Sequence, residues 1–201
     1  MIDEDIEAQY GPTGAYDLVG DFANADWGVY NRISNGGNQS RMWRTLTQDE
    51  WDYLFYERNA STVNYKENAR FAKATIDNVT GLIVLPDSFT LPAGISLYNI
   101  NREYNYFSSN IYTTQQWSQL EANGAIFLPS AGVFCYDSYY YSHGEDLSDC
   151  YYCDDGFSQY WTTTSSGDGL RALRMEFSKN YLDANLNGSR SDKLSVRLVR
   201  D

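Results

Sequence analysis

The chain has few of the side chains that usually build catalytic or metal sites. Its 201 residues contain one His and three Cys, and no Lys or Arg lies between Arg102 and Arg171. Fifteen basic side chains stand against 27 acidic ones, which gives a net charge of −12. This charge repels a phosphate backbone, so nucleic acid is not expected as a partner. No apolar run reaches the length of a membrane span, and no span is expected.

The scarcity of Pro and the abundance of aromatic residues indicate a folded body. Only four Pro occur, while aromatic side chains make up 16% of the chain. A length of 201 residues is most simply one domain, which can bury a core without metal ions or disulfide bonds. The first residues, MIDEDIEAQY, lack the basic start and apolar run of a secretory signal, although a signal removed from the chain would leave the same sequence.

The three cysteines, Cys135, Cys150 and Cys153, lie close together in the sequence. Because they are clustered and odd in number, no disulfide framework could hold the whole fold together. A Cys150–Cys153 bridge, a bridge that includes Cys135, and free thiols are all compatible with this spacing.

Two helices are expected from their capping signals. Thr47-Gln48-Asp49-Glu50 is a capping box, and the apolar residues after it predict a helix from about Gln48 to Arg58. A second helix, at about 114–122, would begin at Thr113 or Thr114 and stop at Asn123-Gly124.

Apolar runs at 81–85 and 125–128, each followed by Pro, predict buried strands. Further strands are expected at 160–164, 170–177 and 194–199. In the strand 170–177, apolar residues alternate with Arg174 and Glu176, which predicts one apolar and one solvent-exposed face. Helices interleaved with short strands, without a regular βαβ repeat, indicate an α+β fold. Four tryptophans beside these elements are expected in the core: Trp43, Trp51, Trp117 and Trp161.

The most unusual stretch runs from Cys135 to Tyr160. Its 26 residues include seven Tyr, five Asp, four Ser, all three Cys and the only His, while Leu147 is its only aliphatic residue. Tyr supplies a large rigid contact area at a small entropic cost, and Ser, Gly and Asp supply adaptable polar contacts. Disordered segments are poor in aromatic residues, so we interpret this stretch as a recognition loop.

Several short sequence motifs, separated along the chain, resemble those of the formylglycine-generating-enzyme branch of the C-type lectin fold. They are WRTLTQDEW at 43–51, GLIVLPD at 81–87, the stretch from Trp117 to Gly132, YWTT at 160–163 and SVRLVR at 195–200. The resemblance covers about residues 26–201. It implies a C-type lectin-like fold with two helices, a twisted, mainly antiparallel sheet and long irregular loops.

Within that fold, the chain is similar to the variable proteins of diversity-generating retroelements of the Bacteroidetes and gut-phage type. In those systems template adenines are randomised, mostly in Asn codons that end in a pyrimidine. Within 135–160 only Glu145 and Gln159 lie outside what such codons can encode. The resemblance implies a scaffold (1–134), a variable ligand-binding region (135–192) and a C-terminal core strand (193–201), displayed outside the cell on a bacterial surface or a phage particle.

The expected ligand surface combines 135–160 with 165–171 and 178–192. Its aromatic anchors would be Tyr136, Tyr139, Tyr140, Tyr141, Tyr151, Tyr152 and Phe157. Polar specificity would come from Asp137, His143, Asp154, Asp155, Arg171, Arg174, Tyr181 and Arg190. Since the Tyr-rich loop is acidic, we expect a protein or glycan partner of positive or neutral character.

No cofactor or metal is expected. Cys135, His143, Cys150 and Cys153 are the ligand types of a zinc site, but seven residues separate the first two, and only the last two have finger-like spacing. The sequence has enough acidic residues to bind calcium, but it contains neither the spacing of an EF-hand loop nor the Glu-Pro-Asn motif of calcium-dependent lectins.

No catalysis is expected either. His143 has no Ser or Cys partner in a triad-like context. The enzymes of the similar branch use a redox-active cysteine pair or copper thiolates late in the chain, whereas the cysteines here lie in the Tyr-rich stretch. Two alternatives stay open: an oxidase that uses Cys150 and Cys153, and a structural subunit of a surface assembly, which would need a large apolar interface.

Overall fold

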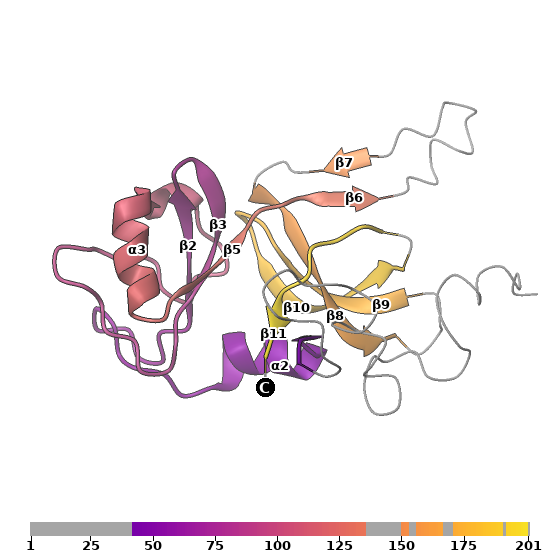
Figure 1. Cartoon of the computed structure of the whole chain (residues 1–201), viewed down its shortest axis with the longest axis horizontal. Helices are drawn as coiled ribbons and strands as arrows, with labels where there is room; N and C mark the ends of the chain where they lie inside the picture. The colour runs from indigo at the N-terminus through magenta and orange to yellow at the C-terminus, as the bar shows by residue number, and fades with distance from the viewer. Residues whose placement is uncertain (1–41, 136–149, 153–155, 167–170, 191, 201) are drawn as a thin grey trace, which may run out of the picture.

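The computed structural model describes residues 42–135, 150–152, 156–166, 171–190 and 192–200, and its architecture is α+β, as the sequence predicts. Two larger antiparallel-rich sheets lie at opposite sides of the molecule, and α2 lies beside the junction between them (Figure 1). The remaining two sheets are short two-stranded ribbons.

The first helix begins where the capping box predicts. In α2 (Gln48–Asp52), the Thr47 hydroxyl accepts a hydrogen bond from the Glu50 amide, and the Glu50 carboxylate accepts one from the Thr47 amide. The chain then widens into a π-helix at Tyr53–Glu57, so the expected helix 48–58 is confirmed in extent but not in uniform geometry. Such π-turns interrupt the regular ladder of helical hydrogen bonds.

The second helix, α3 (Thr114–Ala122), also agrees with its capping signals. Thr113 is the N-cap in a capping box with Gln116, and Gly124 has a φ of 87°, a left-handed conformation that suits glycine. Figure 1 shows α3 lying against the sheet that contains β2, β3 and β5.

That sheet has the strand order β4–β2–β3–β5. Its members are β2 (Phe71–Ile76), β3 (Val79–Val84), β4 (Ile111–Tyr112) and β5 (Ile126–Pro129). Only the β2–β4 pair is parallel. Asp77 and Asn78 join β2 to β3 with φ angles of 44° and 69°, as in the two-residue turns that match strand twist. The Asp77 carboxylate also accepts hydrogen bonds from the amide and hydroxyl of Thr114, which ties this turn to α3.

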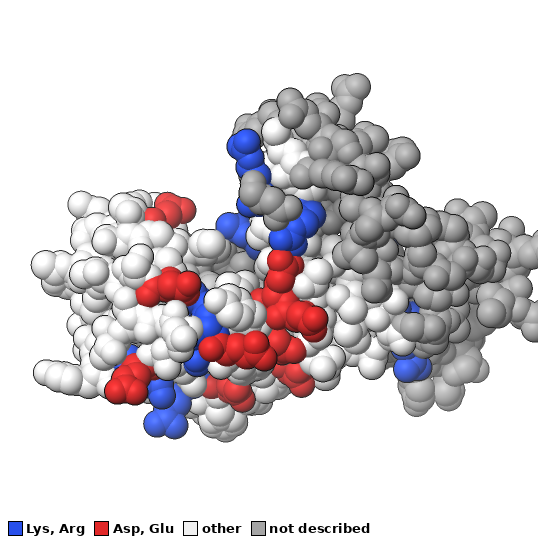
Figure 2. Space-filling model, turned by 90° about the horizontal axis from the view of Figure 1, so that it is seen from below, with Lys and Arg blue, Asp and Glu red and all other residues white. Residues whose placement is uncertain are grey.

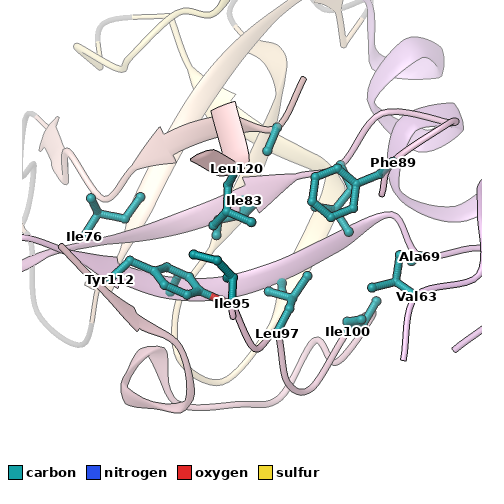
Figure 3. Packing of buried hydrophobic residues seen from close by; sticks show 14 residues of the cluster. Val63, Ala69, Ile76, Ile83, Phe89, Ile95, Leu97, Ile100, Tyr112 and Leu120 are labelled. Carbon is teal, nitrogen blue, oxygen red and sulfur yellow. The ribbon is translucent and has the colours of Figure 1, made fainter. Parts of the chain in front are cut away.

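Both faces of this sheet are buried. Alternate residues such as Ala72, Ala74 and Ile83 enter one core with α3 and the segment 89–100, whose packing Figure 3 shows. Their neighbours Phe71 and Leu82 enter a second core. Burial on both sides explains why 81–85 is a continuous apolar run rather than an alternating one.

The second large sheet has the strand order β10–β9–β8 and is antiparallel throughout. Its strands are β8 (Ser158–Ser165), β9 (Arg171–Phe177) and β10 (Leu182–Ser189). Its inner face supplies Tyr160, Met175 and Phe177 to the second core, where they meet Trp51 and Phe55 of the first helix. The two sheets and α2 therefore share one core.

The expected core positions of the tryptophans are confirmed fully only for Trp51. Its side chain is 1% exposed, whereas Trp43, Trp117 and Trp161 are half-buried. Trp117 still packs against the first core and lies 5.7 Å from the Phe127 ring, measured between ring centroids.

The C-terminal segment is paired rather than free, as expected, but its residues 194–199 are only half-buried. Strand β11 (Leu198–Val199) pairs with β1 (Arg44–Thr45), and Ser195 forms an isolated bridge with Tyr160. The regular strand is shorter than the expected 194–199, because only two residues continue the ladder.

Candidate functional site

The expected ligand surface divides into residues that the structure describes and residues that it does not. Eight of the expected site residues lie outside the described residues: Tyr136, Asp137, Tyr139, Tyr140, Tyr141, His143, Asp154 and Asp155. Tyr151 and Tyr152 are described as positions in a strand. Phe157, Arg171, Arg174, Tyr181 and Arg190 are described with their side chains.

The Tyr-rich stretch is carried on a short antiparallel stem. Strand β6 (Val133–Cys135) pairs with β7 (Cys150–Tyr152), so Tyr151 and Tyr152 belong to a strand rather than to an aperiodic loop. The sequence did not predict β7, because a three-residue strand is too short to show a periodicity. Figure 1 shows this ribbon beside the β8–β9–β10 sheet.

The stem is fixed at its base by close packing around glycine. A Cβ atom on Gly156, whose φ is 69°, would lie 2.2 Å from the ring of Phe107. The Gly132 amide donates to the Phe157 carbonyl at 3.2 Å, and Gly132 bridges Ser158. Phe157 is half-buried at this base, so it lies beside the root of the stem rather than among freely exposed anchors.

Arg174 and Tyr181 are brought together by a carboxylate that sequence reasoning did not select. Arg174 Nε donates to Glu176 Oε2 at 3.1 Å, and the Tyr181 hydroxyl donates to Glu176 Oε1. Gln159 Nε2 donates to Glu176 Oε2 at 2.5 Å from the neighbouring strand β8. These four side chains form a network on the outer face of the sheet.

The outer face of β9 is therefore not the solvent-exposed face that the alternation predicted. Glu176 is 6% exposed and Gln159 is 4% exposed, while Arg174 is half-buried. Burial raises the pKa of Glu176 above its ordinary value of 4.5, against the opposing effects of the Arg174 charge and the bond from Gln159. The alternation of apolar and polar residues along β9 showed which residues share a face of the sheet. It did not show that polar side chains from neighbouring segments would cover that face.

Gly188 allows this face to pack closely. A Cβ atom at Gly188 would lie 2.6 Å from Arg174 Nη1 and 3.1 Å from the Trp161 ring. The glycine on β10 thus leaves room for the Arg174 side chain and the indole. Arg174 also lies 3.9 Å from Asp192, measured from Nη1 to Oδ2.

Arg171 and Arg190 lie at the far end of the same sheet. Arg171 is exposed and pairs in register with Ser189, and the half-buried Arg190 directly follows β10. Within the expected range 178–192, Leu182 and Ala184 are buried in the second core, so only part of that range is available for contact.

The surface near α2 is acidic. Figure 2 shows acidic side chains gathered across the middle of the face seen from below. Burial raises the pKa of Tyr56, and so do three nearby carboxylates, those of Glu103, Asp183 and Asp52. Asp183 belongs to β10, so this negative field reaches the sheet that carries the expected ligand surface.

A second group of exposed tyrosines was not selected from the sequence. Tyr98, Tyr104 and Tyr106 are 57%, 69% and 61% exposed on the framework. Their common signal is a stretch rich in Asn and Tyr at 98–106, which shares the abundance of Tyr, but not the abundance of Asp and Ser, with the Tyr-rich stretch.

Metal and membrane features can be judged for the described residues only. Within them, no group of three or more His, Cys, Asp or Glu side chains could hold a metal ion, but His143 and Cys153 of the zinc hypothesis lie outside them. None of the helices among these residues is both long and apolar enough to cross a membrane.

Comparisons with family models, curated proteins and solved structures find no match to this chain.

Proposed function

We propose that the chain is a ligand-binding variable protein, of receptor or adhesin type, that is diversified by a retroelement. It presents a surface rich in Tyr, Asp and Ser, comprising residues 135–160, 165–171 and 178–192, on a C-type lectin-like scaffold. It acts outside the cell, on a bacterial surface or a phage particle, without catalysis and without an obligatory cofactor.

The observation that carries the proposal is that two paired strands, β6 and β7, flank a segment that is rich in Tyr. Paired strands β6 and β7 enclose a segment, 136–149, that holds four of the seven tyrosines in the stretch. The base of the stem is packed against Phe107 so closely that only glycine fits at position 156. A Tyr-rich segment that follows and precedes paired strands with a closely packed base supports a binding role, because binding and catalytic residues often lie on loops held by a rigid scaffold.

The described part of the proposed surface includes Arg171, Arg174, Tyr181 and Arg190, which are half of the residues proposed for polar specificity. Arg174 and Tyr181 are held by the buried Glu176 carboxylate, so their positions are set before a ligand arrives. Pre-organised side chains bind more tightly because less entropy is lost on association. The acidic field around Tyr56 favours a partner with positive or neutral character.

Two competing functions make different predictions. An oxidase of the formylglycine-generating type would need Cys150 and Cys153 as a reactive pair. We expect that replacing both with Ser leaves folding and binding near normal when the protein is kept reduced; a loss of an oxidase activity would favour the enzyme. A structural subunit would instead form a permanent apolar interface, and size-exclusion chromatography with light scattering would then show a stable oligomer.

The class can be tested in the encoding DNA. Retroelement diversification requires a nearby reverse transcriptase gene and a near-copy of the 3′ end of the coding sequence that differs at adenines. Sequencing the genomic neighbourhood in several isolates would reveal both, with differences concentrated in codons 135–192. Isolates that vary evenly along the gene would contradict the proposal.

The binding surface can be tested in the protein. Binders would first be selected from a phage-displayed peptide library and from a printed array of neutral and acidic glycans. Replacing Tyr139, Tyr140 and Tyr141 with Ala should abolish binding and leave the thermal midpoint within about 2 °C, because the proposal assigns these tyrosines to ligand contact rather than to the core, and substitutions outside the core change stability little.

A matched control removes the same number of tyrosines from the framework. Tyr98, Tyr104 and Tyr106 are exposed, and their replacement with Ala should preserve binding. Equal losses from both triple variants would show that binding depends on surface tyrosine in general. Unfolding of the first variant would show that its tyrosines are core residues.

A further inference from the structure

A small apolar pocket lies between α2, the edge strand β5 and the C-terminal strand β11. It has a volume of about 270 Å³, and its walls are mostly aliphatic: Leu46, Leu54, Val84, Ile126, Leu128 and Val199. Ile126, which is 41% exposed, and Tyr53, which is 50% exposed, place part of this lining at the surface. Such concave apolar sites with a few polar groups are the usual form of small-molecule sites.

The unmet hydrogen-bonding capacity at this pocket consists of donors. Trp51 lines the pocket with a side chain that is 1% exposed, and its Nε1–H has no hydrogen-bond partner. Arg197 also lines the pocket and is half-buried, and none of the ion pairs among the described residues involves it. A buried donor without an acceptor is costly, so the Trp51 indole lacks a partner that it needs, and the guanidinium of Arg197 can donate charge-assisted hydrogen bonds to an acceptor in the pocket.

The one carboxylate that lines the pocket does not supply this acceptor. Both oxygens of Glu50 accept hydrogen bonds from Arg44, each at 2.7 Å, and Oε2 also accepts from the Thr47 amide. The bonds from Arg44 are the main reason that the pKa of Glu50 lies below its ordinary value of 4.5. The charge of Glu50 is balanced by that of Arg44, so Arg197 gives the pocket a net charge of one positive unit. The whole chain, by contrast, carries −12.

The geometry points to a binding site for a small monocarboxylate, with an aromatic ring or short acyl chain in the apolar pocket and its carboxylate on Arg197. A charge-assisted bond between guanidinium and carboxylate is stronger than a neutral hydrogen bond, which sets the head group. The volume sets the tail: an engineered cavity of about 150 Å³ holds benzene, and drug-sized ligands need about 300 Å³ or more. A single ring with a two-carbon linker, as in 3-phenylpropionate, therefore suits this space.

This site is independent of the proposed ligand surface. All residues that line the pocket lie in 46–54, at Val84, or in 126–128 and 197–199, outside the range 135–192 that would vary. If the chain is diversified, every version would keep this pocket. If the chain is not diversified, the pocket and its charge are unchanged, so either proposal can fail alone.

The test uses the full chain and two probes that differ in charge. Isothermal titration calorimetry with 3-phenylpropionate should give saturable binding with a stoichiometry near one, and the neutral isostere 3-phenylpropanol should bind at least about tenfold more weakly. Arg197→Gln should weaken binding of the carboxylate by about tenfold or more, since it removes a charged hydrogen-bond partner. The matched control is Arg200→Gln, which removes the same charge from an exposed residue outside the pocket and should leave binding within twofold.

A second variant keeps the test decisive if Arg197→Gln does not fold. Ile126→Trp fills the pocket from its partly exposed wall and should abolish binding without changing the charge. Equal affinity for the acid and the alcohol would overturn the proposal, and so would equal effects of Arg197→Gln and Arg200→Gln. Absence of saturable binding by the wild-type chain at millimolar 3-phenylpropionate would overturn it as well.

Discussion

The two larger sheets differ in what covers their second face. The β4–β2–β3–β5 sheet has an apolar core on each side, whereas the β10–β9–β8 sheet has an apolar core on one side and a hydrogen-bonded polar network on the other. Among the described residues, each sheet also buries one acidic or basic side chain, Lys73 in β2 and Glu176 in β9. The comparison shows two ways in which this chain accommodates a buried charge.

Lys73 and Glu176 have partners of different kinds. Lys73 Nζ donates to two backbone carbonyls, those of Glu103 and Tyr181, and any residue at those positions would provide them. Glu176 depends on the side chains of Gln159, Arg174 and Tyr181. Substitution of Glu103 or Tyr181 would therefore preserve the hydrogen bonds of Lys73. Substitution of Gln159, Arg174 or Tyr181 would remove a hydrogen bond of Glu176.

The largest expected effect separates the two faces of β9. Phe177 is fully buried and stacks on Tyr160 with ring centroids 6.3 Å apart, so Phe177→Ala should lower the free energy of unfolding by about 3–5 kcal/mol. Arg174→Ala, on the outer face, should cost about 1 kcal/mol because the arginine is only half-buried. Urea unfolding measures both; equal losses would remove the distinction between the faces.

The next prediction concerns the stem of the Tyr-rich stretch. Cys135 and Cys150 are direct register partners, and such residues have Cα atoms about 4.5–5.5 Å apart, within the range of a disulfide. Oxidised glutathione should oxidise the two thiols by thiol–disulfide exchange, forming one Cys135–Cys150 bond and leaving reduced glutathione. The bond closes a short loop and should stabilise the fold by about 3 kcal/mol.

Peptide mapping by mass spectrometry under non-reducing conditions identifies the bond. Cys153→Ser should leave it intact, and Cys135→Ser should remove it. A linked Cys150–Cys153 peptide would mean that the backbone register does not decide the pairing.

The third prediction uses the pH dependence of Lys73. Burial lowers the pKa of Lys73 from 10.5 to about 8, so between these values the unfolded chain binds more protons than the folded one. The free energy of unfolding should therefore rise with pH, by about 2 kcal/mol between pH 8 and 9.5, relative to Lys73→Met. Parallel pH profiles of the two proteins would show that Lys73 is not desolvated.

Glu176 should show a smaller effect of the opposite sign. Its pKa is raised by burial, so above pH 4.5 the folded chain holds the proton that the unfolded chain has lost. Relative to Glu176→Gln, the wild-type chain should therefore lose stability as the pH rises from 4 to 7. Thermal unfolding at both pH values measures the difference, and a wild-type gain over this interval would contradict the assigned environment.

Local signals predicted most of the scaffold. The capping boxes at Thr47 and Thr113 depend on atoms within one turn. The paired strands β3 and β5 follow from apolar runs that end at or just before Pro. The specific C-type lectin-like fold was suggested by resemblance alone, and it stays a prediction.

The site was less predictable because it depends on distant residues. Gln159 and Glu176 meet only when β8 pairs with β9, and Gly188 of β10 matters because it lies against Arg174 of the neighbouring strand β9. The pocket beside Trp51 requires Arg197, which is far away in the sequence. Periodicity within one strand carries no information about such partners.

The pairing of β1 with β11 has a consequence for the order of folding. The β2–β3 hairpin closes through a two-residue turn, whereas Arg44 reaches its partner Val199 only across most of the chain. Contacts of such separation form late, because closing a long loop costs entropy before any contact repays it. During synthesis, the hairpin can form while translation continues, but the β1–β11 ladder must wait until Val199 has left the ribosome. We therefore expect kinetic φ-values near zero for this ladder and higher values in the β2–β3 hairpin.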